Sequence, residues 1–258
     1  MTAALALPSM PSLDLDGRRA LVTGAGRGIG VALAAALVGA GAETWLAART
    51  AGEVDDVAAR LRAKGGSAHA LPMDVTDLDG CERLLEALPP FDILVNNAGA
   101  NRPKPMTGVT VDDYDAVFDL NVRATYFISR HVAGRMIAEG VRGSIIHIGS
   151  QMGHVGAANR TLYCASKHAV EGLNKAMAVE LAPYGIRVNT IAPTFIDTPM
   201  TRPFFEDEAF RSAIMSKIKL GRLGKAEDLM GAVVFLASDA AAMMTGASLI
   251  IDGGWTAE

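Results

Sequence analysis

The sequence has few cysteines and no block of like charge, and both shortages narrow what the protein can be. Its 258 residues include two cysteines, Cys81 and Cys164, which lie far apart and outside any metal-ligand spacing. Neither a disulfide framework nor a metal site is therefore expected. The 24 basic and 28 acidic residues give a net charge of −4 and are scattered along the chain. Without a basic block to follow a phosphate backbone, nucleic acid is not expected as a partner.

Long apolar runs are missing as well. The longest stretch of small apolar residues, Val31 to Ala42, is too short to span a bilayer, and residues 1–17 contain no Lys or Arg that would mark a leader. We therefore expect a cytoplasmic protein that does not enter a membrane. Residues 1–13, which include Pro8 and Pro11, are expected to form a flexible arm.

Half of the residues are apolar, and they follow one pattern that repeats along the chain. Short β-branched or apolar runs alternate with longer helical patterns, which is typical of βα units and a parallel sheet. The pattern predicts an α/β fold with a doubly wound parallel sheet of about seven strands and helices on both faces. The expected strands are Ala20–Thr23, Thr44–Ala48, Ala68–Pro72, Ile93–Val95, Ser144–Ile148, Arg187–Ile191 and Ser248–Ile251. The expected helices are Ile29–Gly39, Val54–Lys64, Leu78–Leu88, Val111–Glu139, Leu162–Leu181 and Glu227–Ala237.

No linker or internal repeat interrupts this alternation of strands and helices, so residues 14–258 are expected to form a single domain. The least regular part begins at Pro193, where Pro199 and Pro203 punctuate a segment too long for an ordinary turn. Such segments often act as lids, and we predict a substrate lid over residues 194–217, which Thr198-Pro199-Met200 opens.

A glycine-rich turn follows the first expected strand. In Thr23-Gly24-Ala25-Gly26-Arg27-Gly28-Ile29-Gly30 the glycines allow a tight turn and a close approach to a diphosphate, while the next helix offers its free N–H groups. The spacing differs from the common G-x-G-x-x-G fingerprint. A strand-to-helix turn that binds nothing is the alternative.

Four further motifs follow in order, namely Asn96-Asn97-Ala98-Gly99, then Asn121, then Ser150, then Tyr163 with Lys167. In this combination the chain resembles the short-chain dehydrogenase/reductase family over roughly residues 15–255. The resemblance implies a Rossmann fold, a nicotinamide cofactor and the interconversion of an alcohol and a carbonyl compound by hydride transfer. Within the family the chain is similar to gluconate 5-dehydrogenases and related sugar-acid or polyol dehydrogenases, and next to 3-oxoacyl thioester reductases. The closing Asp252-Gly253-Gly254-Trp255 resembles the family's interface segment and implies a homotetramer.

The expected catalytic residues are Asn121, Ser150, Tyr163 and Lys167. Tyr163 and Lys167 are four residues apart, so on a helix they share one face, and a nearby ammonium lowers the pKa of a phenol. Tyr163 is therefore predicted to act as general acid or base, and Ser150 to hydrogen-bond the reacting oxygen. The resemblance gives Asn121 the role of tying a water to Lys167. For each residue alone, an ordinary amphipathic or exposed position is the competing interpretation.

The expected nucleotide contacts come from several separate segments of the chain. The second strand ends in Ala48-Arg49 without a carboxylate, so NADP is preferred and NAD remains possible. Asp74 is expected at the adenine amino group by resemblance, although it could simply cap the next helix, and Asn96 is expected with Ala98 and Gly99 near the ribose. The full expected set is Gly24, Arg27, Gly28, Ile29, Gly30, Arg49, Asp74, Val75, Asn97, Ala98, Gly99, Tyr163, Lys167, Pro193, Ile196 and Thr198.

The expected substrate contacts are Arg102, Met152, His154 and Asn159. Arg102 follows the Asn96–Gly99 turn on a proline-restricted loop and is predicted to bind a carboxylate through two hydrogen bonds. The alternative is a solvated loop charge or a subunit contact. Thr194 stands where the family usually has glycine, which changes the expected pocket shape near the nicotinamide.

Three functions stay open from the sequence. The first is a sugar-acid or polyol dehydrogenase, and the second is a 3-oxoacyl thioester reductase with an apolar or basic entrance. The third is a nucleotide-binding sensor without turnover, which the complete Ser150, Tyr163 and Lys167 set disfavours.

Overall fold

The computed structural model describes residues 7–198 and 201–257, and its centre is a parallel sheet of seven strands. The strand order is β3-β2-β1-β4-β5-β6-β7, and each neighbouring pair is parallel, with Val22 opposite Leu46 and Val95. The chain therefore winds outward in both directions from the β1–β4 boundary, which confirms the predicted fold class. The strands are β1 (Arg19–Thr23), β2 (Glu43–Ala48), β3 (Ala68–Pro72), β4 (Ile93–Asn96), β5 (Ser144–Ile148), β6 (Arg187–Pro193) and β7 (Ser248–Ile251).

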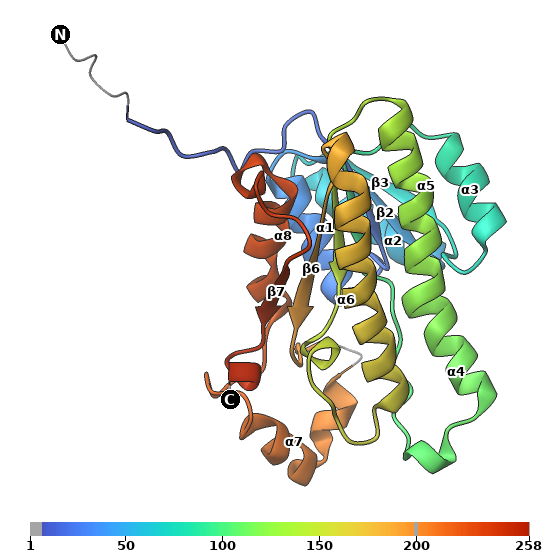
Figure 1. Cartoon of the computed structure of the whole chain (residues 1–258), viewed down its shortest axis with the longest axis vertical. Helices are drawn as coiled ribbons and strands as arrows, with labels where there is room; N and C mark the ends of the chain where they lie inside the picture. The colour runs from blue at the N-terminus through green and yellow to red at the C-terminus, as the bar shows by residue number, and fades with distance from the viewer. Residues whose placement is uncertain (1–6, 199–200, 258) are drawn as a thin grey trace.

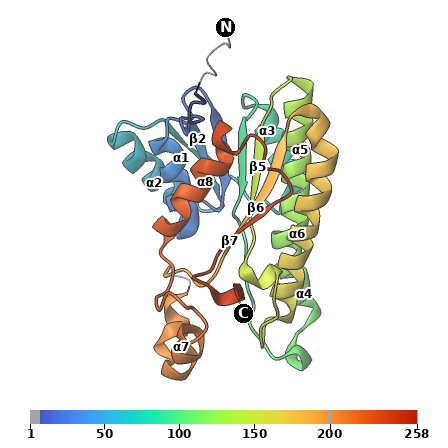
Figure 2. The ribbon, with the colours of Figure 1, turned by 60° about the vertical axis from the view of Figure 1, so that its left-hand side comes forward.

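Helices cover both faces of the sheet (Figures 1 and 2). On one face α1 (Ile29–Gly39), α2 (Ala51–Ala63) and α8 (Met230–Ala237) bury a core that includes Leu33, Val54 and Val233. On the other face α3 (Leu78–Glu86), α5 (Thr125–Ala138) and α6 (Thr161–Leu181) bury Cys81, Ile128 and Met177. Because both faces are covered, the central strands are buried along their whole length, and their apolar runs are nearly continuous.

The expected helix over Val111–Glu139 is not continuous. α4 (Val111–Phe118) ends in a π-helical turn over Asp119–Ala124, and α5 begins after it. The expected helix over Glu227–Ala237 likewise starts as a 3₁₀ turn at Ala226–Leu229, before α8. Hydrophobic spacing does not register such local changes of helix type, because the buried positions remain close to the same face.

The segment expected to be an irregular lid contains a helix of its own. Asp207 caps α7 (Glu208–Met215) by accepting hydrogen bonds from the Ala209 and Phe210 backbone N–H groups. α7 lies beyond the ends to which β6 and β7 point, at the bottom of Figure 1. Phe195, Phe205 and Phe210 pack edge-on or tilted against one another near it, and Phe195 stacks on Trp255. Pro199 and Met200, where the lid was expected to open, lie outside the described residues.

Candidate active site

A cleft of about 350 Å³ opens at the carboxyl ends of the central strands. Two sets of residues that are far apart in the sequence line it, one around the glycine turn after β1 and the other around Ser150, Tyr163 and Lys167. The expected nucleotide contacts line this cleft except Gly30, which packs behind Gly24, and Asn96. The structure therefore brings the phosphate-binding turn and the reactive side chains into one continuous space.

The glycine turn has the shape that a diphosphate needs. Gly24 and Gly28 have φ angles of +65° and +59°, which favour glycine over any residue with a side chain. A Cβ on Gly24 would lie 2.9 Å from the Ala98 Cα, so the two turns touch backbone to backbone. Gly28 is the N-cap of α1 and offers no side-chain cap, which leaves the first N–H groups of the helix open toward the cleft. These residues fit a dinucleotide.

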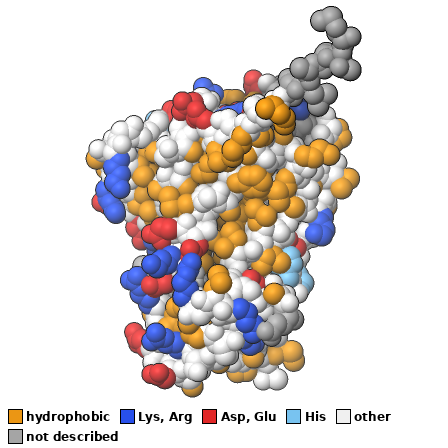
Figure 3. Space-filling view, turned by 90° about the vertical axis from the view of Figure 1, so that its left-hand side faces the viewer, with side chains coloured by type: hydrophobic (Ala, Val, Ile, Leu, Met, Phe, Trp, Pro, Cys, Tyr) orange, Lys and Arg blue, Asp and Glu red, His pale blue; other side chains and the backbone are white. Residues whose placement is uncertain are grey.

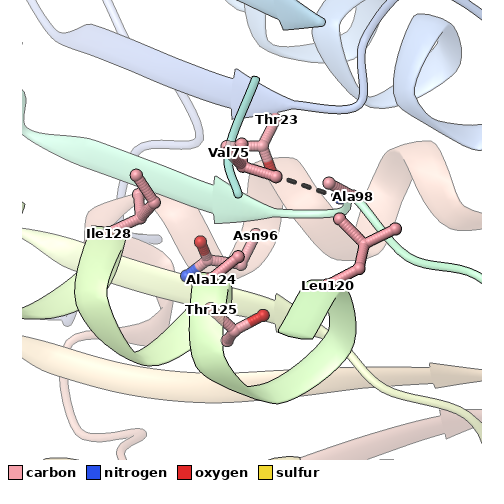
Figure 4. Close-up of a pocket in the computed structure, with 8 residues that line it drawn as sticks. All are labelled: Thr23, Val75, Asn96, Ala98, Leu120, Ala124, Thr125 and Ile128. Atoms are coloured by element: carbon pink, nitrogen blue, oxygen red, sulfur yellow. Dashed lines mark hydrogen bonds between the residues drawn. The ribbon is translucent and has the colours of Figure 1, made fainter. Parts of the chain in front are cut away.

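Thr23 links the glycine turn to the end of β4, the neighbouring strand in the sheet (Figure 4). Its Oγ1 accepts hydrogen bonds from the Asn97 and Ala98 backbone N–H groups, at 3.0 and 3.1 Å. The Asn97 side chain donates back to the carbonyls of Thr23 and Gly24. Asn96 points elsewhere, because its buried amide bonds Ser129 Oγ at 2.8 Å and His147 Nδ1 at 3.1 Å. Its side chain thus holds β4 to the helix layer instead of lining the nucleotide cleft.

The end of the cleft at which the adenosine is expected, here called the adenosine end, is bordered by Arg27, Arg49, Thr50, Glu53 and Asp74. Asp74 Oδ1 accepts from the Thr76 backbone and hydroxyl, so part of this carboxylate shapes its own turn. Thr50 is the N-cap of α2, yet its side chain makes no cap hydrogen bond. Glu53 instead lies against the glycine turn, with its Oε2 2.8 Å from where a Gly26 Cβ would be. This carboxylate was not predicted from the sequence.

Tyr163 and Lys167 share one face of α6, as their spacing predicts. The Lys167 ammonium lies 5.6 Å from the centre of the Tyr163 ring and donates to the Ile148 carbonyl at 2.8 Å. Burial lowers the pKa of Lys167 to about 8, and Glu171 opposes that shift. The expected lowering of the tyrosine pKa is not found. Burial raises the pKa of Tyr163, while a hydrogen bond with Ser150 acts in the opposite direction, so the phenol is protonated at neutral pH.

Ser150 follows β5 after one intervening residue, Gly149, in a tight, buried turn. Its Oγ donates to Gln151 Oε1 at 2.8 Å and accepts from the Met152 backbone N–H at 3.1 Å. Gly149 makes the turn possible, since a Cβ there would lie 2.6 Å from Thr190 Cγ2 on the neighbouring strand. The hydroxyl is therefore fixed on rigid backbone beside Tyr163.

Asn121 lies in the π-helical turn and is 2 % exposed. Its amide donates to the Ala100 carbonyl at 2.9 Å and to Ser166 Oγ at 3.0 Å, while its Oδ1 accepts from the Ala100 N–H at 2.8 Å. The side chain thus ties the Asn96–Gly99 turn to α6. In doing so it positions Ala100, while its expected link to Lys167 through a water stays a prediction.

Of the four expected substrate contacts, Met152 lines the cleft and the other three do not. Arg102 and Lys104 both bind Asp113, at 3.3 and 2.5 Å, where that carboxylate also completes the capping box of α4. Lys104 above all holds the pKa of the Asp113 carboxyl well below its usual range. His154 Nε2 lies 3.0 Å from Ser248 Oγ, and Asn159 adopts a left-handed backbone with φ +58°. The guanidinium of Arg102 is therefore engaged outside the cleft.

Two polar residues of the cleft wall were missed. Gln151 is 1 % exposed, and its Nε2 has no hydrogen-bond partner among the described residues. Arg160 is 7 % exposed and donates from Nη1 to the Asn159 carbonyl at 3.3 Å. No signal in the sequence pointed to Arg160, because the predicted helix over Leu162–Leu181 makes Thr161 an ordinary N-cap.

The comparisons with known proteins agree with this geometry. A family model described as "Enoyl-(Acyl carrier protein) reductase" matches residues 24–256. D-erythrulose reductase of Gallus gallus is 40 % identical over 95 % of this chain and 98 % of its own length. The chain belongs to the short-chain dehydrogenase/reductase family. It is accordingly an NAD(P)-dependent oxidoreductase.

Two further relatives of this short-chain dehydrogenase/reductase differ in the chemistry that their names give. A 3-oxoacyl-(acyl-carrier-protein) reductase of Vibrio harveyi is 39 % identical over 94 % of this chain and 98 % of its own. A gluconate 5-dehydrogenase of Burkholderia cenocepacia, solved in complex with NADP and tartrate, is 36 % identical with a TM-score of 0.93, and the match covers 96 % and 99 % of the two chains. Among residues 7–198 and 201–257, no helix is long and apolar enough to cross a membrane, and no His, Cys, Asp or Glu group could hold a metal ion.

Proposed function

We propose that this protein interconverts an alcohol and a carbonyl compound with NADP(H), and that Tyr163 is the general acid or base. The observation that carries the proposal is the convergence of Ser150, Tyr163 and Lys167 on a cleft whose other half is a glycine cradle for a dinucleotide. When bound, the nicotinamide supplies or accepts the hydride. The side chains of the protein carry out the proton transfers.

The arrangement of hydrogen bonds suits carbonyl reduction. The protonated Tyr163 phenol donates to the substrate oxygen, and Ser150 polarises the same oxygen by turning its hydroxyl from Gln151 to the substrate. In oxidation the phenol must first lose its proton. Because burial raises the pKa of Tyr163, the oxidative rate is expected to keep rising above neutral pH.

The substrate class that we propose is a sugar acid or a polyol. This rests on a polar cleft wall with Gln151 and Arg160, and on relatives named gluconate 5-dehydrogenase and D-erythrulose reductase. The similarity to a 3-oxoacyl reductase keeps an acyl thioester as the second candidate. Initial rates with aldonic acids, alditols and acetoacetyl thioesters, each measured with both nucleotides, test the proposal. Absence of turnover with all of them, alongside tight nucleotide binding, would favour a sensor.

NADP is proposed over NAD because Arg27, Arg49 and the uncapped Thr50 surround the place that a 2′-phosphate would take. Glu53 opposes this preference, since its carboxylate lies at the same end of the cleft and repels a phosphate.

Glu53→Gln is therefore expected to tighten NADP⁺ binding by about threefold to tenfold, in line with about 1 kcal/mol between unit charges about 4 Å apart in water. NAD⁺ binding should stay unchanged or weaken. Calorimetric titration with both nucleotides measures this. Asp55→Asn, which removes the same charge from an exposed position on α2, is the control. Weaker NADP⁺ binding by Glu53→Gln would mean that Glu53 orients an arginine instead.

We also propose a homo-oligomer, built on the face seen in Figure 3, where apolar side chains gather over α8 and β7. β7 is the last strand of the sheet, and Ile250 on it is 41 % exposed. α8 is apolar all round, but Val234 and Phe235 are only partly buried. An apolar edge strand beside an all-apolar helix is normally covered by another part of the protein or by a second subunit.

We also propose a cytoplasmic location, because Cys81 and Cys164 are both free.

Ile250→Lys is expected to raise the subunit dissociation constant by about 10-fold to 100-fold, because an unpaired ammonium would be buried in the contact. Light scattering after size exclusion measures the mass across a dilution series. Leu84→Lys, which changes a side chain of 40 % exposure on α3 at the other face, is the control and should leave the mass unchanged. A monomeric unaltered protein would contradict the proposal.

A further inference from the structure

Arg160 occupies a position that is electrostatically adverse on two counts. It is the N-cap of the 21-residue helix α6, and its side chain makes no cap hydrogen bond. The N-terminal end of a helix carries partial positive charge and favours anions, so a guanidinium there is unfavourable. The side chain is also 7 % exposed, and burial lowers the pKa of its guanidinium. Residues that break local rules in this way are typical of functional sites.

The same residue belongs to the reactive half of the cleft. Arg160 lines it, and it lies three residues before Tyr163, immediately before the first turn of α6. Its charge acts on the reactive phenol, since Arg160 is among the groups that lower the pKa of Tyr163 against the effect of burial. Gln151 lines the cleft as well, and the Nε2 of this buried amide has no partner among the described residues. A charged donor and a neutral donor therefore flank Ser150 and Tyr163.

We propose that Arg160, together with Gln151 Nε2, forms an anion subsite in the substrate half of the cleft, and that the preferred substrate is a hydroxy acid whose carboxylate binds there. A carboxylate accepts two hydrogen bonds from a guanidinium, and its negative charge suits the N-terminal end of α6. Neutral polyols and 3-oxoacyl thioesters have no carboxylate to place there. The subsite rests on the proposed oxidoreductase function and narrows its substrate to one class. It also replaces Arg102, whose guanidinium binds Asp113.

The decisive comparison uses gluconate and glucitol, which share a carbon chain and differ in the terminal carboxylate. Arg160→Gln is expected to lower kcat/KM for gluconate by about 10-fold to 100-fold, mainly through KM, and to change that for glucitol by less than about threefold. Arg160→Lys should recover part of the loss, because it restores the charge without the planar fork. Arg102→Gln tests the rival arginine, and Arg60→Gln, on the surface of α2, controls for loss of one positive charge.

Two readouts do not depend on turnover of a chosen substrate or on one variant folding well. In the presence of NADP⁺, the unaltered protein should bind tartrate at least about tenfold more tightly than the neutral tetritol threitol in calorimetric titration. The rising limb of the pH profile for oxidation should move to higher pH in Arg160→Gln, since Arg160 lowers the pKa of Tyr163.

Equal losses on gluconate and glucitol, or a loss confined to Arg102→Gln, would overturn the subsite. So would equal binding of tartrate and threitol by the unaltered protein. Turnover of glucitol or an acyl thioester without any turnover of gluconate would leave the proposed oxidoreductase function standing and refute the anion subsite alone. A protein that binds NADP⁺ but turns over none of these compounds would instead refute the proposed function.

Discussion

Tyr163→Phe is expected to lower turnover by about 10³-fold to 10⁴-fold, which is the upper range for loss of a positioned general acid or base. The variant keeps the ring that packs beneath the Lys167 ammonium and removes the proton that the substrate oxygen must receive. Lys167 cannot take over, because its ammonium donates to the Ile148 carbonyl and lies 5.6 Å from the ring centre. Initial rates of reduction and oxidation at saturating nucleotide measure the loss.

Binding separates this role from a structural one. The dissociation constant for NADP⁺ should change by less than about threefold, because the glycine cradle and the adenosine end are untouched. Tyr114→Phe removes a hydroxyl from a tyrosine on α4 that stacks on Phe118 outside the cleft, and it should keep full turnover. Residual activity of Tyr163→Phe above about one tenth of the unaltered enzyme would show that another group moves the proton.

The double variant Arg27→Gln/Arg49→Gln is expected to weaken NADP⁺ binding by about 10²-fold to 10⁴-fold, while NAD⁺ binding changes little. Both arginines line the adenosine end of the cleft, and each charge-assisted hydrogen bond to a phosphate contributes about 1.5–3 kcal/mol. The two nucleotides differ only in the 2′-phosphate, so their ratio isolates this contact. Titration at two salt concentrations measures it, since the lost term is the salt-sensitive one.

Adding Ala48→Asp to Arg49→Gln extends the same test. A carboxylate at the end of β2 repels a 2′-phosphate and accepts hydrogen bonds from a 2′-hydroxyl, so this variant should prefer NAD⁺. An unaltered enzyme that already has the higher kcat/KM with NAD(H) would contradict the assignment of both arginines.

The seven strands and most helices could be predicted because burial on both faces leaves an unambiguous pattern. β3, β5 and β7 have the predicted bounds, and α1 begins and ends as predicted. α7 was missed because its cap is local to Asp207 and its packing comes from aromatic residues distant in sequence. Periodicity carries no information on such contacts.

At the site, motif positions could be predicted and charge partners could not. The backbone-dictated residues, such as Gly24 and Ser150, lie where the motifs place them. Arg102 was predicted to face the substrate, but Asp113, eleven residues further along, binds it once α4 folds back. The direction of the Tyr163 pKa shift also depended on burial, which no spacing of Tyr and Lys can reveal. Ion-pair partners and pKa shifts depend on neighbours in three dimensions, so they are the hardest properties of a site to predict from a sequence.

The π-helical turn between α4 and α5 bears on both the active site and the helix layer. Such a turn is what a helix becomes when it accommodates one surplus residue, and each residue turns an α-helix by about 100°. Because the wider turn absorbs the surplus residue and the rotation of about 100° that comes with it, the stripe of α5 that carries Ile128, Val132 and Met136 stays in phase with α4. Shortening the chain by one residue here would therefore leave the core face of α5 in place while it withdrew the Asn121 amide from Ala100. The surplus residue sets the geometry of the active site and leaves the packing of the helix layer unchanged.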